Sequence, residues 1–328
     1  MVDSLVPTPA PSKDDEPDEP DRLAVEPSPA PAAAGPEREF TVAARSQSRM
    51  VLRRFLQHRA AVLAGLALVL VVLLSLVGGR FWTYTYEEQT DDLSDPPSLE
   101  HPMGTNSIGQ DNFAQVLRGA QKSVQIALVV ALVSTSFGTL VGSLAGYYRG
   151  WSDSVLMRAA DLLLVIPPLV FFALLGNKFA SEPGSWFYLA LALAAVLWTS
   201  VARVVRGIFL SLREKEFVEA ARALGASDKR IMFKHLLPNA VGPIIVNATI
   251  TVAVAILLET SLSFVGLGVK PPDTSLGKLI SDNQQAARTR PWLFYFPGIF
   301  IVTIALSVNF LGDGLRDALD PTQRRVRA

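Results

Sequence analysis

The sequence contains no cysteine and only three histidines in 328 residues. Without cysteine the chain has no disulfide, thiolate metal site, iron–sulfur cluster or cysteine nucleophile. His58, His101 and His235 fall in three separate segments without the spacing of metal ligands, which favours surface roles for them. The formal net charge is zero, so no global basic field recruits nucleic acid.

Sequence motifs of common enzyme sites are missing as well. The Gly277-Lys278 pair lacks the preceding glycine and the following Ser or Thr of a phosphate-binding P-loop. There is no His-Glu-x-x-His helix, and Phe310 stands before Gly312-Asp313 where an intramembrane aspartyl protease would have glycine. The sequence therefore predicts no catalytic residue, cofactor or metal ion in this chain.

The chain is rich in apolar residues, which make up 50% of it and give a mean hydropathy of +0.32. Residues 1–40 are an exception, because they consist largely of Pro, Ala, Asp and Glu with runs such as Asp14-Asp15-Glu16. This composition predicts a disordered cytoplasmic tail. It does not predict a signal peptide, because the first 30 residues contain no apolar core. Residues 41–59 are interpreted as a cytoplasmic lead-in to the first membrane span.

The remainder, residues 60–328, is predicted to form a six-span membrane domain. Each apolar stretch is near the ~20 residues that cross a bilayer as a helix. Backbone groups in lipid must form hydrogen bonds within the segment, so the expected fold class is an all-α integral membrane protein. The predicted spans are residues 60–78, 124–147, 160–176, 186–202, 240–258 and 294–312.

The distribution of Lys and Arg predicts the orientation of these spans. When the N-terminus is assigned to the cytoplasm, Arg53, Arg54, Arg149, Arg203 and the basic C-terminus share one side. Positive charge gathers on the cytoplasmic side of membrane proteins. We therefore expect a multi-pass protein of the plasma membrane with both termini in the cytoplasm.

The second and third spans have special residues at helical spacing. Gly138, Gly142 and Gly146 recur every fourth residue, and this pattern predicts close helix packing, within the chain or with a partner. Pro167-Pro168 lies in the middle of the third span and is expected to kink it. A kinked span can line a transport pathway or simply belong to a packed bundle.

Glu259 is an ionisable residue beside an apolar run, and such residues often mark a pathway. It lies far enough along its span to reach the outer interface instead. Pathway or gating contact and helix packing therefore both remain open for Glu259.

The loop of residues 206–239 between spans four and five is predicted to be folded. A short amphipathic helix is expected to place four apolar side chains on one face and to end at Gly225. A second helix, capped by Ser227 or Asp228, is expected to continue until Pro238. The four apolar side chains are Phe217, Ala220, Ala221 and Leu224.

Two amphipathic helices outside the bilayer point to a partner. A docking protein is the natural inference, and binding to the lipid interface is the alternative.

A specific resemblance to a known family supports a protein partner over the lipid interface. Glu219-Ala220-Ala221, then Gly225, then His235-Leu236-Leu237-Pro238 resembles the EAA motif of binding-protein-dependent ATP-binding-cassette importers. In that family the EAA loop is the coupling helix, which docks on the ATPase subunit. A histidine at position 235 is familiar in the peptide-transport branch of this family. The chain resembles the second, C-type permease subunit of the dipeptide, oligopeptide and nickel transport family.

Three further stretches resemble the same branch. Gly104-Thr105-Asn106 and Gly109-Gln110-Asp111 match an outer segment in which Asn106 and Gln110 replace the usual Asp and Arg. Residues 259–272 match the fifth span and its following turn, although Leu276 stands where Trp is usual. Residues 312–321 match the C-terminal signature. The resemblance thus covers residues 50–327.

The resemblance implies a permease subunit that forms half of a translocation pathway and transmits ATPase motion. Its implied partners are a second permease subunit of similar fold, two cytoplasmic ATPase subunits that hold ATP and magnesium, an extracytoplasmic binding protein and membrane lipid. The residues implied to couple ATPase motion are Glu219, Ala220, Ala221, Gly225 and Pro238.

The cargo and the energy source have alternatives. Di- or oligopeptides are the favoured cargo, and nickel or another small solute is an alternative within the same architecture. An ion-gradient-driven secondary transporter would require symmetric interrupted helices with charges at the midplane, and no clear internal repeat is seen.

Overall fold

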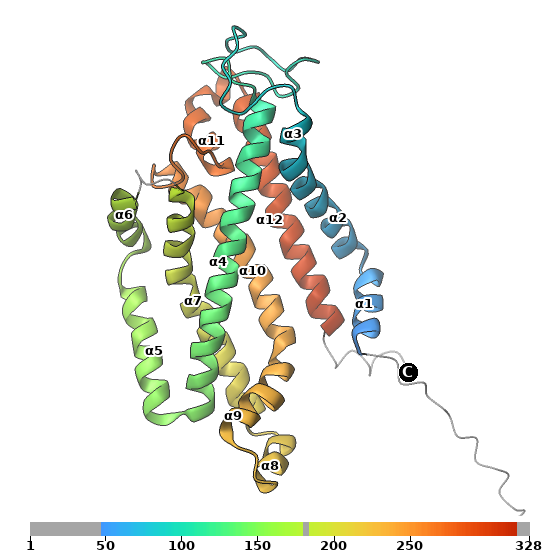
Figure 1. Ribbon diagram of the computed structural model, residues 1–328, viewed down its shortest axis with the longest axis vertical. Helices are drawn as coiled ribbons and strands as arrows, with labels where there is room; N and C mark the ends of the chain where they lie inside the picture. The colour runs from blue at the N-terminus through green and yellow to red at the C-terminus, as the bar shows by residue number, and fades with distance from the viewer. Residues whose placement is uncertain (1–46, 180–183, 320–328) are drawn as a thin grey trace, which may run out of the picture. The chain divides into compact units, whose positions relative to one another are not determined.

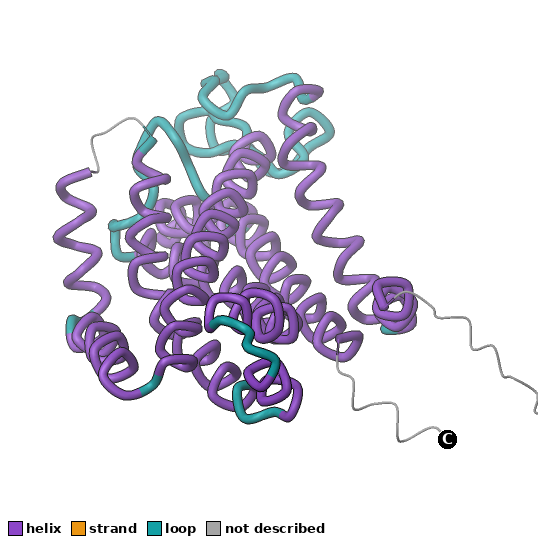
Figure 2. Tube along the Cα trace, turned by 60° about the horizontal axis from the view of Figure 1, so that its bottom comes forward, coloured by secondary structure: helices purple, strands orange, loops and turns teal. Residues whose placement is uncertain are grey.

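The computed structural model describes residues 47–179 and 184–319. The predicted tail of residues 1–40 lies outside these ranges, as does part of the lead-in. Every regular element of the described chain is a helix, apart from an isolated bridge between Thr105 and Asp111. Figure 2 shows that coil gathers at the ends of a helical bundle.

The first span follows a short amphipathic helix, α1 (Gln47–Gln57). His58 caps the start of α2 (Arg59–Leu73), because its Nδ1 accepts a hydrogen bond of 3.1 Å from the Ala61 N–H. A π-helical turn (Leu74–Gly78) and α3 (Gly79–Phe81) complete it. These helices form a continuous apolar stretch from Arg59 to Phe81 that is long enough to cross a membrane, as predicted.

The second and fourth spans are α4 (Asn112–Tyr148) and α7 (Ser185–Leu212). The predicted glycine face of α4 packs within the chain, against α7. A Cβ at Gly142 would lie 2.4 Å from the Ala202 carbonyl oxygen, and one at Gly138 would lie 2.7 Å from Val201 Cβ. Only glycine lets these two backbones approach so closely.

The third span is interrupted rather than kinked. α5 (Gly150–Val165) ends before Ile166, which adopts an extended ψ of 120°, and α6 (Pro168–Phe179) begins two residues later. A proline disfavours helical conformation in the residue before it, and two successive prolines remove two donors. Five helical stretches of the described chain are therefore long and apolar enough to span a membrane, and the predicted third span is divided into halves.

The folded loop contains α8 (Glu216–Ala223) and α9 (Asp228–Arg230). A π-helical segment (Ile231–Leu236) then leads directly into α10 (Leu237–Phe264). The prediction that the second loop helix ends at Pro238 is wrong, because helix continues through it. The wider π-helical turn precedes the proline, and the Asn239 side chain donates a 2.6 Å hydrogen bond to the His235 carbonyl.

The chain finishes with a short helix and a last span. α11 (Leu276–Asn283) and a 3₁₀ turn (Gln284–Arg288) follow α10, and α12 (Trp292–Leu319) runs back toward the α8 end. In Figure 1 the coil of residues 82–111 lies at the opposite end of the bundle from α8. We call the two ends of the bundle the 82–111 end and the α8 end.

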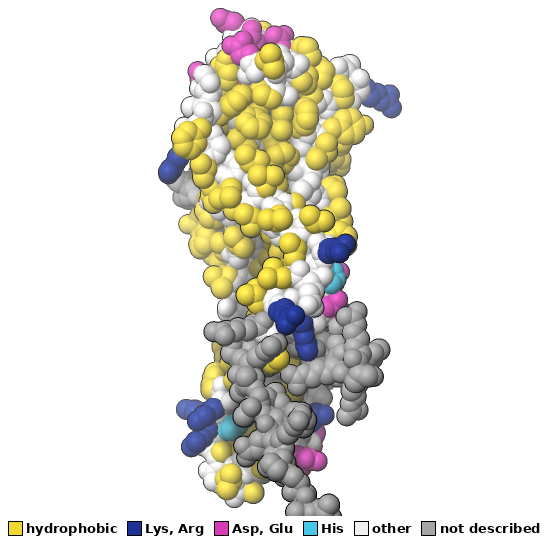
Figure 3. Space-filling model, turned by 90° about the vertical axis from the view of Figure 1, so that its right-hand side faces the viewer, with side chains coloured by type: hydrophobic (Ala, Val, Ile, Leu, Met, Phe, Trp, Pro, Cys, Tyr) yellow, Lys and Arg dark blue, Asp and Glu magenta, His cyan; other side chains and the backbone are white. Residues whose placement is uncertain are grey.

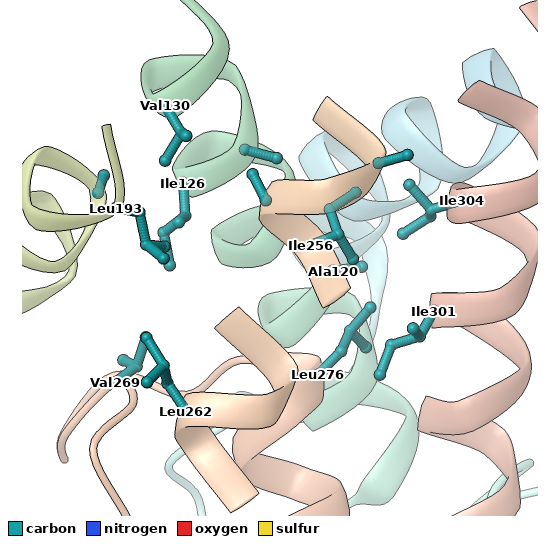
Figure 4. Close-up of a cluster of buried hydrophobic side chains, with 14 of the residues drawn as sticks. Ala120, Ile126, Val130, Leu193, Ile256, Leu262, Val269, Leu276, Ile301 and Ile304 are labelled. Atoms are coloured by element: carbon teal, nitrogen blue, oxygen red, sulfur yellow. The ribbon is translucent and has the colours of Figure 1, made fainter. Parts of the chain in front are cut away.

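The core lies among α4, α7, α10, α11 and α12. Figure 4 shows Ile126, Leu193, Ile256, Leu276 and Ile304 within it. The sides of the bundle are also apolar, with Leu63 68% exposed on α2, and Figure 3 shows hydrophobic side chains over much of one face. An apolar interior within an apolar exterior is the arrangement that a lipid environment allows.

Candidate functional site

The short helix α8 has an apolar face that the chain leaves uncovered. Phe217 and Leu224 are 40% and 88% exposed, and Ala220 is exposed between them. These positions are separated by three, four and seven residues, so they line one side of the helix. We call Phe217, Ala220 and Leu224 the exposed ridge.

The opposite face of α8 packs onto the bundle. Val218 and Ala221 are buried with Ile231 and Leu236 of the π-helical segment and with Phe209 of α7. Full burial of a side chain such as valine contributes about 1.5–3 kcal/mol. The loop is therefore a folded element that is fixed to the membrane helices.

Ala221 does not lie on the same face as Phe217, Ala220 and Leu224, although the sequence predicted that it would. It is 7% exposed and belongs to the buried cluster, whereas Ala220 faces outward. At ~100° per residue Ala221 lies about 60° from Val218, so it sits at the boundary of the two faces and the bundle covers it. Glu219 is exposed and lies outside the ridge.

Gly225 ends α8 in the predicted way. Its φ of +77° is in the left-handed region. The Gly225 N–H donates to the Arg222 carbonyl at 2.9 Å, and the Ala226 N–H donates to the Ala221 carbonyl at 3.0 Å. These two bonds form a Schellman motif, in which glycine is favoured because a side chain strains the left-handed conformation.

Tyr147 ties the loop to the end of α4, and sequence reasoning did not single it out. Its hydroxyl donates a 2.6 Å hydrogen bond to Asp228 Oδ1. Its carbonyl accepts a hydrogen bond from Arg213 Nη1. An aromatic residue at the end of a predicted span next to a charged loop is the signal that could have indicated this contact.

Glu259 is fully buried near the 82–111 end of α10. Its carboxylate accepts hydrogen bonds from the hydroxyls of Ser275 at 2.6 Å, Ser263 at 2.8 Å and Ser123 at 3.2 Å. Ser275 also caps α11 by accepting from the Lys278 N–H. The structure thus places Glu259 in a contact that joins α4, α10 and α11, far along α10 from α8.

Leu276, the departure from the usual Trp, is fully buried in this region. Its N–H donates a 3.2 Å hydrogen bond to Ser123 Oγ. A Cβ at Gly119 of α4 would lie 3.0 Å from the Leu276 nitrogen. α11 and α4 are therefore in close backbone contact at this point.

The other two departures are partners of each other. Asn106 Nδ2 donates to Gln110 Oε1 at 2.9 Å, and Asn106 Oδ1 accepts from the Gln110 N–H at 2.9 Å. A neutral hydrogen-bonded pair thus stands where the resemblance leads us to expect Asp and Arg. Because both charged residues are replaced together, no single charge is left without its partner.

Asp111 organises the coil of residues 82–111. It caps α4 through the Ala114 N–H at 2.7 Å, and its other carboxylate oxygen lies 2.8 Å from His101 Nδ1. Burial, the largest influence, favours a lower pKa for His101, but hydrogen bonds to Asp111 and Asp92 outweigh it and raise the pKa above 6.5.

Two cations on α4 share one carboxylate beside this coil. Arg118 Nη2 lies 2.6 Å from Asp273 Oδ1, and Lys122 Nζ lies 2.9 Å from Asp273 Oδ2. Partial burial, the largest influence, works to raise the pKa of Asp273, but the two cations lower it overall. We call Arg118, Lys122 and Asp273 the cation cluster.

The predicted site residues thus fall in separate places. The residues predicted for coupling gather at the α8 end, the Pro167-Pro168 break lies between α5 and α6, and Glu259 lies near α11. No group of three or more metal-ligating side chains occurs in the described ranges.

A bundle of helices long and apolar enough to span a membrane, with a folded amphipathic loop at one end, defines a polytopic membrane protein. Comparison with known proteins makes this class specific. Residues 138–325 match the family of binding-protein-dependent transport system inner membrane components. Residues 46–102 match the N-terminal transmembrane domain of oligopeptide transport permease C.

Curated relatives extend this match to most of the chain. The oligopeptide transport system permease protein OppC of Mycobacterium tuberculosis is 44% identical over 283 residues, 86% of this chain and 97% of the relative. The Bacillus subtilis protein of that name is 36% identical over 90% of this chain. An inward-facing structure of the MetNI methionine ABC transporter shares the fold, with a TM-score of 0.52 and 20% identity over 63% of this chain and 96% of that chain.

The chain belongs to the binding-protein-dependent transport system inner membrane component family and is a transmembrane permease subunit of an ATP-binding-cassette importer. Such a subunit is not an enzyme, because ATP hydrolysis takes place in separate subunits. The predicted family, the helical membrane fold and the importer role are confirmed.

Proposed function

We propose that this chain is one of the two permease subunits of an oligopeptide importer in the plasma membrane, with the α8 end and both termini in the cytoplasm. The names of its relatives and the matched N-terminal domain support peptide cargo. The excess of Lys and Arg on the α8 side supports the orientation. The full importer contains a second permease subunit, two ATPase subunits that bind ATP and magnesium, and an extracytoplasmic binding protein.

The single observation that carries this proposal is the exposed ridge. Leu224 is 88% exposed on a helix whose other face is packed onto the bundle. An apolar strip of this kind fits a groove in a partner protein. The proposed occupant is the cytoplasmic ATPase subunit.

The helices behind the ridge provide a route for movement. From Asp228 to Phe264 the chain is one helical stretch that begins in the loop and reaches Glu259. Tyr147 and the buried cluster attach α8 to α4 and α7. Displacement of α8 by the ATPases therefore moves these spans as a body, and ATP binding favours the conformation in which the ridge makes the better contacts.

The remaining predicted site residues receive separate proposals. The Pro167-Pro168 break leaves two half-helices within a span, an arrangement that is tolerated where it lines a cavity or is buried in protein. We assign this break to the pathway wall. For Glu259 its enclosure by serine hydroxyls supports the packing role.

Affinity purification of the tagged chain in mild detergent tests the proposal. We expect ATPase subunits and a second permease subunit to co-purify, and the reconstituted complex to import peptides with ATP. Gly225→Val is expected to leave the chain inserted but to separate ATP hydrolysis from transport, because valine strains the left-handed turn. A chain that purifies alone and transports with an ion gradient would refute the proposal.

A further inference from the structure

The cation cluster at the 82–111 end carries more positive than negative charge. Arg118 and Lys122 lie one turn apart on α4, and both face the carboxylate of Asp273. Arg118 Nε and Nη2 donate to the same oxygen at 3.1 and 2.6 Å. Two cations that share one carboxylate leave a net positive charge in the cluster, which favours a second anion.

Lys122 is the more enclosed of the two cations. Its side chain is 9% exposed, and its ammonium lies 4.7 Å from the centre of the Trp186 ring. An ammonium has three N–H donors, so contact with Asp273 leaves donor capacity unused. A buried cation is stabilised by every further charge-assisted hydrogen bond that it can form.

The cluster is open on one side. The side chains of Arg118 and Asp273 are 29% and 21% exposed. The Arg118 guanidinium lies 4.8 Å from the centre of the Tyr86 ring, and Trp186 covers Lys122. Aromatic rings thus back the cations, while a ligand can approach from the exposed side.

The face of α4 below the cluster is polar before it becomes apolar. Gln121 and Gln125 follow Arg118 at helical spacing and are partly exposed. Arg118 Nη1 donates to Gln121 Oε1 at 3.1 Å, whereas the Gln125 amide has no hydrogen-bond partner in the described chain. Leu132, on the same face, is 69% exposed. An unpaired amide on a membrane helix is costly in lipid and favours a polar ligand or water.

We infer that the cation cluster receives a carboxylate of the cargo, the free C-terminus of a peptide, while the amides of Gln121 and Gln125 contact the peptide backbone. The inference rests on the proposed function. The incoming carboxylate accepts from Lys122 Nζ and from the Arg118 guanidinium in competition with Asp273. A free carboxylate is common to unmodified linear peptides, so such a site holds cargo regardless of its side chains.

The test compares peptides of one sequence that end in a carboxylate or in an amide. ATP-driven uptake is measured with the complete importer in liposomes, as kcat/KM for each peptide. The same binding protein delivers both peptides, so its own preference cancels when a variant is compared with wild type. We expect Arg118→Gln and Lys122→Gln to lower the acid-to-amide ratio about tenfold, the size of one lost hydrogen bond to a charged group.

Two variants of the cluster distinguish ligand binding from support of the fold. Arg118→Lys keeps the charge and is expected to keep most of the preference for the acid. Asp273→Asn removes the competing anion and is expected to raise the ratio, a gain that mere structural damage does not produce. Lys278, which pairs with Asp282 on α11, supplies the control variant Lys278→Gln with an unchanged ratio.

Failure of the inference differs from failure of the proposed function. If wild type imports both peptides and the variants reduce both by the same factor, the cluster does not bind the cargo carboxylate. The same result is expected if the cluster contacts a carboxylate of the binding protein instead of the cargo, and it overturns the inference in that case too. If wild type imports neither peptide, the proposed peptide function fails and the inference falls with it.

Discussion

The two ends of the bundle are held by opposite kinds of contact. At the 82–111 end, buried polar groups join the elements, with Glu259 bonded to three serine hydroxyls and Asp111 to His101. At the α8 end, a small apolar cluster and a glycine turn hold a helix whose outer side is uncovered. The comparison shows that buried polar contacts within the chain hold the first end, while the second end leaves an apolar helix face uncovered.

The largest expected effect is a loss of stability when Glu259, near the 82–111 end, is replaced. Glu259→Ala removes the shared acceptor of three hydroxyls, which should lower the stability of the importer by ~3 kcal/mol or more because unsatisfied buried groups are costly. Thermal unfolding of the purified importer measures this loss. Glu259→Gln keeps an acceptor oxygen and should lose less. Normal stability of Glu259→Ala with abolished transport would instead indicate a pathway role.

Next in size is the loss of coupling in Gly225→Val. Valine at a φ of +77° should reshape the turn, so that stimulation of ATPase activity by loaded binding protein falls about tenfold while the subunits still assemble. Gly225→Asn is the matched control, since Asn tolerates the left-handed region. Wild-type transport by Gly225→Val would show that this turn does not set the position of α8.

A smaller effect is expected for the ridge itself. Leu224→Ser should weaken binding of the ATPase subunit by about 1–2 kcal/mol without changing the thermal stability of the permease, because Leu224 contacts little within the chain. Titration of the ATPase subunit against permease in nanodiscs measures the affinity. Glu216→Gln on exposed α8 surface is the control, and equal affinities for all three proteins would exclude the ridge as the contact.

The smallest effect is a pH dependence at the 82–111 end. The pKa of His101 is raised in the folded protein, so its contribution to stability is present below pH 6.5 and is lost as pH rises through the raised pKa. Hydrogen exchange of residues 82–111 should therefore quicken as pH rises, after correction for intrinsic exchange. His101→Gln should remove this dependence, and an identical profile in that variant would assign it to another group.

Much of the fold could be predicted because the bilayer restricts the choice. Apolar length gave the spans, and the glycines at 138, 142 and 146 indicated their packing. What sequence could not show depends on small rotations and on tertiary partners. Ala221 was placed on the wrong face because it lies at the boundary between two faces of α8.

Pro238 and the polar contacts illustrate the same limit. Helix continues through Pro238 because a π-helical turn precedes it, and no local pattern announces that turn. Asp273 meets Arg118 from 155 positions away along the chain, a contact set by packing alone. The pairing of Asn106 with Gln110 likewise became visible only in three dimensions.

The claim that the exposed ridge docks on the ATPase is tested most directly by labelling single cysteines, which the cysteine-free chain permits. Leu224→Cys and, at the opposite end, Leu99→Cys both place a thiol at an exposed position. Maleimide labelling is compared for the permease pair alone and with ATPase subunits bound. We predict strong protection at position 224 and none at position 99. Equal labelling of position 224 in both states would contradict the account.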